Sequence, residues 1–578
     1  MLQTAVQHDA SAVLRRYDFA RALTLRFIAM VALIAVVLPL LSAGPIGETL
    51  TAYQVFRQDL PLLALFLGAV VLRPMPGEGV AAGPSASSMP TLIFSALAIL
   101  LAGWIGQQAV FQGLELSRDE QMAVFDQGIF EHGRLFWPIA TEWRPVADAL
   151  NRSFILPIGA NEYWVSGYLP VHAAFRAALG SIGLSSLASP VLAALGAVGM
   201  WLVARRLWPQ SNGTVIVSLI LLVTSSQLLI TSMTAFSMSM HLALNLLWLT
   251  FFLVDRRSAH VLAALVAFLA TGIHQPLFHP LFALPFVLLL ALQGRWRLFA
   301  FYGAAYAIIC LFWLAWPIWI AAHGAAPPPA TATIGYADRL VAAVRLFDLN
   351  HVWFTAANLL RFISWQHPIL LPLALFGAIS CWREPLVKAL VVSFVLPIIV
   401  MAIILPWQGH GWGYRYLHPV LGNAILLACF GFRRIEKSGL SLRRPLLITT
   451  AIAVLILPVH ALMAARVAQP FVDARKELAE IPADIVIVDI DGVPYGQDVV
   501  FNRSDLSNRP RLLIASLLKP DDLHGLCRRS TIAFYDASEL AGMAQLFGAP
   551  VPVGPSPRAR RLHQAAAAAG CRIVPVPA

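Results

Sequence analysis

Residues 90–120 read PTLIFSALAILLAGWIGQQAVFQGLELSRDE, and this stretch joins the two kinds of sequence from which the chain is built. Its first part, residues 90–107, is apolar and close to the length of about 20 residues that a helix needs to cross a bilayer. Its end carries the adjacent acids Asp119 and Glu120. Carboxylates are costly near hydrocarbon, so an acidic pair just after a membrane helix indicates chemistry at the boundary between lipid and water.

The composition of the whole chain is typical of a protein embedded in lipid. Of its 578 residues, 58% are hydrophobic and 12% are charged, which indicates a polytopic membrane protein. The formal net charge of +11 comes from short basic clusters between apolar runs, where Lys and Arg act as topology signals. Nucleic acid is therefore not expected as a partner.

Further apolar runs on both sides of residues 90–107 bring the predicted number of membrane spans to about thirteen. The first run follows a cluster of arginines and lacks a small-residue cleavage site, which is typical of a signal anchor with a cytoplasmic N terminus. The cores of the predicted spans are 24–43, 59–73, 90–107, 187–204, 214–232, 239–254, 259–274, 277–293, 298–321, 368–382, 387–406, 417–432 and 445–464.

Basic residues mark every second loop, as expected for loops that face the cytoplasm. The clusters are Arg205 and Arg206, Arg256 and Arg257, Arg295 and Arg297, Arg383 and Lys388, and the group Arg433, Arg434, Lys437, Arg443 and Arg444. The loops 108–186, 233–238, 323–367 and 407–416 then share the outer side with the tail from residue 465.

After Ala464 the sequence alternates short apolar strands with polar helices, for example at 484–489 and 511–515. About a hundred residues of this kind suffice for a small α/β domain. We therefore predict a transmembrane part up to residue 464 and a soluble α/β domain at 465–578. In an oxidising compartment Cys527 and Cys571 could form a disulfide, or they are two unrelated thiols.

The outer loop 108–186 carries the candidate site residues. Ser117 and Glu120 have capping-box spacing, and apolar residues follow with helical periodicity, which predicts a helix along the membrane surface. Glu120 either closes this box or takes part in chemistry. Asp119 lies in the first helical turn, where the helix dipole holds it ionised, as a general base requires.

A second group in this loop mixes acids, an arginine and aromatic residues. This combination is used to bind sugars or phosphates and is also common in interfacial aromatic belts. The residues are Glu142, Arg144, Glu162, Tyr163 and Trp164.

Five pieces, in this order, resemble the polyprenyl-phosphate-dependent glycosyltransferases of the GT-C fold, a superfamily that includes protein O-mannosyltransferases and the aminoarabinose transferases of lipid A. They are Asp119-Glu120, residues 179–208 ending in Ala-Arg-Arg-Leu-Trp, Thr-Ser-Ser-Gln-Leu-Leu-Ile at 224–230, residues 270–297 and Gly-Tyr-Arg-Tyr-Leu-His-Pro at 413–419. The resemblance covers most of residues 90–435. It implies a transmembrane catalytic module (90–464) in the inner membrane of a bacterium, preceded by an N-terminal segment with an extra transmembrane hairpin (1–89). The predicted fold is thus an all-α polytopic membrane protein, GT-C-like, with a small C-terminal α/β extracytoplasmic domain.

The resemblance implies an inverting transfer of a sugar from a polyprenyl-phosphate donor to a lipid, glycan or protein acceptor. Asp119 matches the catalytic acid of the family and would take the proton of the acceptor hydroxyl. Arg415, next to Tyr416, is suited to meet the departing phosphate with a bidentate fork, or it snorkels to the interface. His274 and His279 would add donors to the phosphate, or they are buried, hydrogen-bonded histidines.

Three departures from the family pattern concern the site. Three spans rather than one precede the acidic loop, His274-Gln275 stands where the family has Lys-Gly, and no second acid follows the piece at 224–230. Either Glu142 or Glu162 replaces that acid, or no second acid is used. Some relatives use a divalent cation, but no Cys/His cluster has metal-ligand spacing, so no metal ligand is assigned. A transporter or flippase of lipid-linked saccharide, or a non-catalytic assembly subunit, are the alternative functions, although charges gathered in one outer loop argue against transport.

Overall fold

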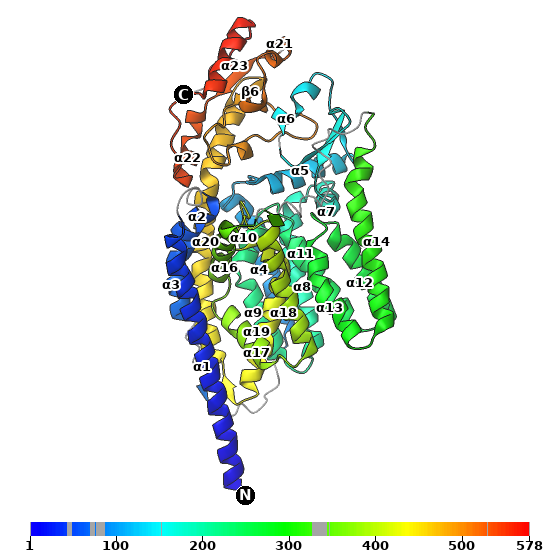
Figure 1. Ribbon diagram of the computed structural model, residues 1–578, viewed down its shortest axis with the longest axis vertical. Coiled ribbons are helices and arrows are strands. Elements are labelled where there is room, and N and C mark those ends of the chain that lie inside the picture. Colours follow the sequence, from blue (N-terminus) through cyan, green and yellow to red (C-terminus); the bar gives the residue numbers. More distant parts are fainter. Residues whose placement is uncertain are drawn as a thin grey trace.

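The structure is a computed structural model that describes residues 2–42, 49–69, 75–76, 87–151, 153–325, 344–345, 347–528 and 530–576. Part of the predicted outer loop 323–367 and parts of the N-terminal segment lie outside these residues. The chain forms an elongated bundle of helices with a small α/β unit at one end, and the N terminus lies at the opposite end (Figure 1). This arrangement confirms the predicted class of a helical protein with a small C-terminal α/β part.

Within the described residues, the predicted apolar cores lie largely on helices of the bundle. The described residues contain six helices long and apolar enough to span a membrane, or seven if α9 and α10, bent by 57°, form one span. The number of spans stays a prediction. The helices are α1 (Leu2–Leu40), α2 (Leu50–Gln54), the π-helix η2 (Val55–Asp59), α3 (Leu60–Ala69), α4 (Met89–Ala109), α8 (Ala188–Leu207), α9 (Asn212–Val223), α10 (Ser226–Ser232), α11 (Met238–Val254), α12 (Arg257–Thr271), α13 (Phe278–Leu292), α14 (Trp296–Ala321), α16 (Leu349–Ser364), α17 (Leu370–Ser380), α18 (Pro385–Ile404), α19 (Leu421–Glu436) and α20 (Arg443–Glu480).

Small residues allow the helices of the bundle to approach closely. A Cβ atom on Gly199 of α8 would lie 2.8 Å from Cβ of Leu246 on α11. On α17 and α19, Gly377 and Gly431 face the partner helix so closely that a Cβ on either would clash with backbone of the other helix. Because lipid tails are as apolar as the side chains, such close packing supplies much of the attraction between membrane helices.

The outer segment folds into α5 (Arg118–Glu131), α7 (Val171–Gly180) and an antiparallel sheet of order β2-β4-β3, with strands Trp137–Pro138, Tyr163–Ser166 and Ile155–Ile158. The capping box at the start of α5 is present as predicted: the backbone N–H of Ser117 donates to Glu120 at 3.1 Å. Met122, Phe125 and Ile129 are buried in one cluster with Trp164 and with residues of the C-terminal sheet. The expectation that α5 rests its apolar face on the membrane surface is therefore wrong, because protein covers that face.

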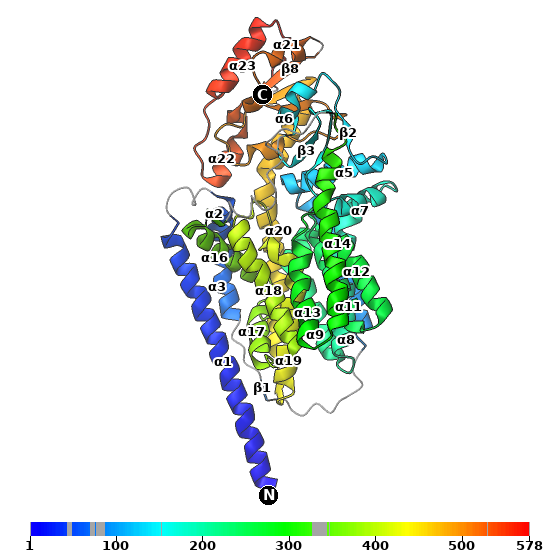
Figure 2. The ribbon, with the colours of Figure 1, turned by 45° about the vertical axis from the view of Figure 1, so that its right-hand side comes forward.

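The C-terminal unit is a three-stranded parallel sheet of order β7-β6-β8, formed by Arg511–Ile514, Ile485–Val488 and Ile532–Tyr535. The helices α21 (Asp522–Cys527), α22 (Ala541–Phe547) and α23 (Pro557–Ala568) belong to the same unit. α20 runs from the bundle into this unit without a break, so the change of composition after Ala464 falls inside a helix (Figure 2). Cys527 and Cys571 form a disulfide, which decides between the two alternatives left open by the sequence.

The disulfide closes a loop across 44 residues of the C-terminal unit, and a cross-link of this span restricts the unfolded chain. The double variant Cys527→Ser/Cys571→Ser should lower the free energy of unfolding of this unit by about 2–4 kcal/mol. Thermal unfolding of the purified protein, with Cys381→Ser as a control that removes a free thiol, measures the effect. Equal melting temperatures for all three proteins would contradict the expectation.

Candidate active site

A cavity of about 280 Å³ lies where the outer segment, the top of the bundle and the C-terminal unit meet. This is close to the lower end of the range typical of small-molecule sites, roughly 300 Å³ and above. Its wall combines charged and imidazole side chains with aromatic ones. The polar and aromatic lining residues include Arg118, Asp119, Asp126, Tyr168, His172, Phe236, His241, His274, Trp407, His410, Arg415, Tyr416, Tyr495 and Asp498.

Asp119 and Arg415 form an ion pair in this cavity, although they lie 296 residues apart in the sequence. The hydroxyl of Tyr168 donates a hydrogen bond to the other oxygen of Asp119, and Nε2 of His274 lies 4.0 Å from the same oxygen. Burial alone would raise the pKa of Asp119, but Arg415, His274 and Tyr168 outweigh it and hold the pKa below its usual value. The carboxylate is therefore ionised at neutral pH.

Arg415 is the first residue of the 3-10 helix η6 (Arg415–Val420), which follows the segment that leaves α18. We call residues 405–415 the Arg415 loop. The guanidinium lies 5.1 Å from the ring centroid of Tyr416 and 5.7 Å from that of Phe236, and its Nη2 donates to the Tyr416 hydroxyl at 3.2 Å. Burial lowers the pKa of Arg415, but Tyr416 and Asp119 raise it by more, so the group stays charged.

The two predicted phosphate-contacting histidines have different surroundings. His274 lies between α12 and α13, lines the cavity and stacks on Tyr168 with 3.7 Å between ring centroids. His279 is not among the lining residues: its Nδ1 contacts Asn245 at 2.8 Å and its Nε2 contacts the Tyr306 hydroxyl at 3.0 Å. Of the two interpretations, the buried, hydrogen-bonded histidine describes His279.

Glu120 lies next to Asp119 but does not line the cavity. One of its oxygens completes the capping box with Ser117, and the other accepts from the backbone N–H of Ala235 at 3.0 Å. Burial raises the pKa of Glu120 to about 8. These contacts fasten the start of α5 to the bundle, so Glu120 positions Asp119 and does not face the reacting space.

None of the five residues predicted to bind sugar or acceptor lines the cavity. Glu142 is exposed, and Nε of Arg144 donates to the Ile139 carbonyl at 3.0 Å. Glu162 accepts from the backbone N–H of Ala325 at 3.0 Å. Trp164 is buried, and its Nε1 donates to the Ser504 carbonyl at 2.9 Å, while Tyr163 packs edge-on against Phe136. The prediction placed them in one site with Asp119, but their side chains contact neighbouring protein outside the cavity, and Trp164 contacts the C-terminal unit.

Several cavity residues were not singled out from the sequence. Tyr168, whose hydroxyl bonds Asp119, follows it by 49 residues without any motif that links them. Arg118 directly precedes Asp119, and this position could have marked it as a site residue. Its Nη1 donates to Gln121 at 2.7 Å and to the Val500 carbonyl at 3.0 Å. From the C-terminal unit, Asp498 contacts His410 at 3.0 Å. This unit therefore supplies part of the cavity wall.

Within the described ranges, no group of three or more His, Cys, Asp or Glu residues is arranged to hold a metal ion. The fixed cations of the cavity are the guanidinium groups of Arg118 and Arg415. Guanidinium forks bind phosphate or carboxylate oxygens directly. The arrangement can thus receive an anionic group beside an ionised carboxylate.

Comparison with known proteins gives a fold-level likeness. No family model matches the chain, and no curated protein matches it. Among solved structures, ArnT from Cupriavidus metallidurans in the apo state has 11% identity and a TM-score of 0.45, over 80% of this chain and 88% of that one. The same protein bound to undecaprenyl phosphate has 12% identity and a TM-score of 0.46, over 78% and 88%. At these values the likeness carries no information about the function of this chain, which has to be inferred from its own residues.

Asp126 provides a pH-dependent test of the cavity wall. Its oxygens accept from the backbone N–H and the hydroxyl of Ser166 at 2.8 and 2.5 Å, and burial raises its pKa to about 7. The unfolded chain releases this proton near pH 4, so the folded state holds an extra proton between about pH 4 and 7. The resulting stabilisation is full below pH 4 and is lost as the pH rises to 7.

Relative to Asp126→Asn, the wild-type protein should therefore lose on the order of 2–4 kcal/mol of stability between pH 4 and pH 8. Melting temperatures of both proteins across this range measure the difference. Asp148→Asn, at an exposed position of the outer segment, is the control and should follow the wild-type curve. Parallel curves for Asp126→Asn and wild type would contradict the assignment.

Proposed function

We propose that the chain is a membrane glycosyltransferase of the GT-C type, which transfers a sugar from a polyprenyl-phosphate donor to an acceptor on the periplasmic face of the inner membrane. The observation that carries this proposal is the pairing of Asp119 with Arg415 in one cavity. Such a transfer requires one group that accepts a proton and a second group that binds the phosphate.

In the proposed reaction, an acceptor hydroxyl attacks the anomeric carbon from the face opposite the lipid phosphate, so the configuration inverts. The hydroxyl proton moves to a carboxylate oxygen of Asp119. The bond between the anomeric carbon and the phosphate oxygen breaks, and the electron pair leaves with the phosphate. Arg415 stabilises the charge that gathers there.

The contacts of Asp119 fit the role of a base. Arg415 and the Tyr168 hydroxyl hold the carboxylate ionised without ligand. When a phosphate enters, it competes for the guanidinium and draws positive charge away from Asp119. The pKa of Asp119 then rises toward the range in which a carboxylate accepts a proton more readily. Binding of the polyprenyl-phosphate carrier would thus make Asp119 a stronger base.

The positions of the basic clusters support the proposed orientation in the membrane. The N terminus and the start of α20 lie at the end of the bundle opposite the C-terminal unit (Figure 2). The C-terminal unit supplies part of the cavity wall, so the cavity lies at its end of the bundle. The clusters from Arg433 to Arg444 belong to that same end because they close α19 and open α20. Under the rule that basic loops face the cytoplasm, the cavity faces the periplasm. The disulfide in the C-terminal unit agrees with an oxidising compartment.

The first prediction of this mechanism concerns Asp119→Asn. The amide cannot take a proton, so turnover should fall by about 10²–10⁴-fold. Carrier affinity should be retained or increase, because the carboxylate that competes with phosphate for Arg415 is gone. Sugar transfer and titration with undecaprenyl phosphate measure the two effects separately.

Turnover of Asp119→Asn close to that of wild type would remove the base assignment. The same assay separates the proposal from its alternative: a protein that only moves lipid-linked saccharide across the bilayer would bind the carrier but transfer no sugar in detergent solution.

The second prediction concerns Arg415→Ala, which should weaken carrier binding by roughly 2–4 kcal/mol through the loss of a charge-assisted contact. This substitution also strands the buried Asp119, so the informative comparison is Asp119→Asn/Arg415→Ala with Asp119→Asn. The loss of affinity should persist between these two proteins, in which no carboxylate is left unpaired. Equal affinity for undecaprenyl phosphate in both would show that Arg415 does not contact the phosphate.

A further inference from the structure

A buried ion pair joins the N-terminal hairpin to α16, outside the cavity described above. Asp59, at the end of η2, and Arg361, on α16, are 1% and 0% exposed, and Nε of Arg361 lies 3.2 Å from Oδ2 of Asp59. The other oxygen of Asp59 accepts from the Ser364 hydroxyl at 3.0 Å and from Nε1 of Trp365 at 2.6 Å. Charged groups within an apolar hairpin are costly, and π-helical turns are frequent at functional sites.

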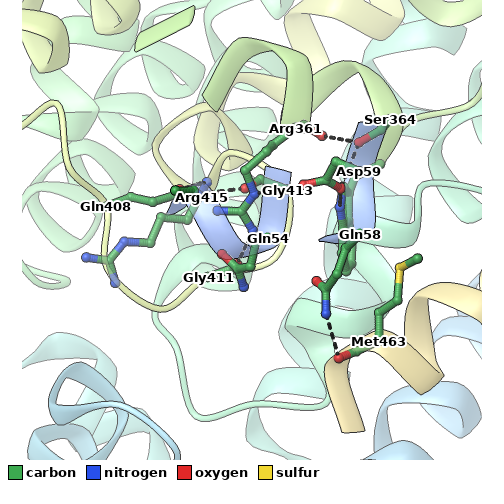
Figure 3. A network of polar contacts seen from close by, with 12 residues as sticks. Gln54, Gln58, Asp59, Arg361, Ser364, Gln408, Gly411, Gly413, Arg415 and Met463 are labelled. Carbon is green, nitrogen blue, oxygen red and sulfur yellow. Dashed lines mark hydrogen bonds and ion pairs between the residues drawn. The ribbon is translucent and has the colours of Figure 1, made fainter. Parts of the chain in front are cut away.

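Arg361 connects this pair to the Arg415 loop. Its Nη2 donates to the carbonyl of Gly411 at 2.7 Å, and Nε2 of Gln54, also from the hairpin, lies 3.5 Å from the same carbonyl (Figure 3). One helical turn earlier on α16, Asn358 donates to the carbonyl of Pro406 at 2.9 Å. The hairpin and α16 therefore hold the loop by its backbone.

Gly411 in turn packs against the side chain of Arg415. A Cβ on Gly411 would lie 3.0 Å from Cδ and 3.3 Å from Cβ of Arg415, so the loop backbone lies directly against the aliphatic part of the arginine. Gln408 fixes the rest of the loop: its Oε1 accepts from the Arg415 N–H at 2.9 Å, and its Nε2 donates to the Gly413 carbonyl at 2.9 Å. A shift of Gly411 therefore shifts the guanidinium that faces Asp119.

We propose that Asp59 and Arg361 are positioning residues that hold the Arg415 loop in place for carrier binding, so that the N-terminal hairpin forms an outer support of the active site. Asp59 neutralises and orients Arg361, and Arg361 fixes Gly411 and through it Arg415. The link to carrier binding rests on the proposed function, whereas the link to the loop conformation does not.

The test uses the full-length protein in detergent and the double variant Asp59→Asn/Arg361→Met. The asparagine keeps an oxygen for Ser364 and Trp365, and both charges disappear together, so no unpaired charge is buried. The loop loses only the hydrogen bond from Arg361 to the Gly411 carbonyl, and the contact of Gln54 with this carbonyl remains. Gln58→Leu is the matched control, because Gln58 is a buried neighbour on η2 whose Nε2 donates to Met463 of α20 and not to the Arg415 loop (Figure 3).

Two measurements are made on each protein: hydrogen exchange of the backbone amides of residues 405–417, and affinity for undecaprenyl phosphate. In the double variant, protection of these amides should fall about tenfold or more while α17 and α19 keep theirs, and affinity should fall about 10- to 100-fold, as misplacement of a binding group does. Gln58→Leu should change neither quantity. Arg361→Lys, which retains a donor near Gly411, should recover part of both.

Unchanged protection of the loop in the double variant, or an equal loss in Gln58→Leu, would overturn the inference. Loosened amides with unchanged affinity would also overturn it, because the loop would then not position Arg415 for the carrier. If the wild-type protein binds no carrier at all, the proposed function fails, while the exchange measurement still decides whether Asp59 and Arg361 hold the loop.

Discussion

The candidate site depends on keeping the mostly buried carboxylate of Asp119 charged. Its side chain is only 15% exposed, and burial favours the neutral acid. Arg415, from the other end of the bundle sequence, and Tyr168, from the outer segment, restore the charged state. The outer segment, which carries both Asp119 and Tyr168, must therefore meet the Arg415 loop at one point.

The segment that delivers Arg415 is not a helix, and its sequence explains why. Pro406 and the glycines Gly409, Gly411 and Gly413 follow α18, and Gly409 and Gly413 adopt positive φ, which other residues rarely do. Such backbone has few internal hydrogen bonds, so its carbonyls need donors from elsewhere. Arg361 serves Gly411, and Gln227 of α10 serves Tyr414 at 2.9 Å. Polar side chains are thus buried around this loop because they donate hydrogen bonds to its backbone carbonyls.

The sequence allowed prediction of the helices, the α/β tail and the capping box of α5, because each follows from local periodicity or spacing. It also paired Asp119 with Arg415, through a resemblance and the side on which their loops lie. It did not place Tyr168 or Asp498 in the cavity, because their approach results from how the outer segment and the C-terminal unit pack. Local composition was misleading for Trp164 and Glu162: their mixture of acid and aromatic residues suits a sugar site, but tertiary packing uses them against neighbouring backbone.

The C-terminal unit contributes residues to the candidate site, although it lies at one end of the molecule. Tyr495 and Asp498 form part of the cavity wall, and Asp498 contacts His410 on the Arg415 loop. From the bundle side the same loop is held by Arg361 of α16 and by Gln54 of the N-terminal hairpin. The Arg415 loop therefore lies between these two residues and the C-terminal unit. Rigid placement of a binding group lowers the entropy lost when a ligand binds. The N-terminal hairpin and the C-terminal unit are therefore components of the site, because they fix the position of Arg415.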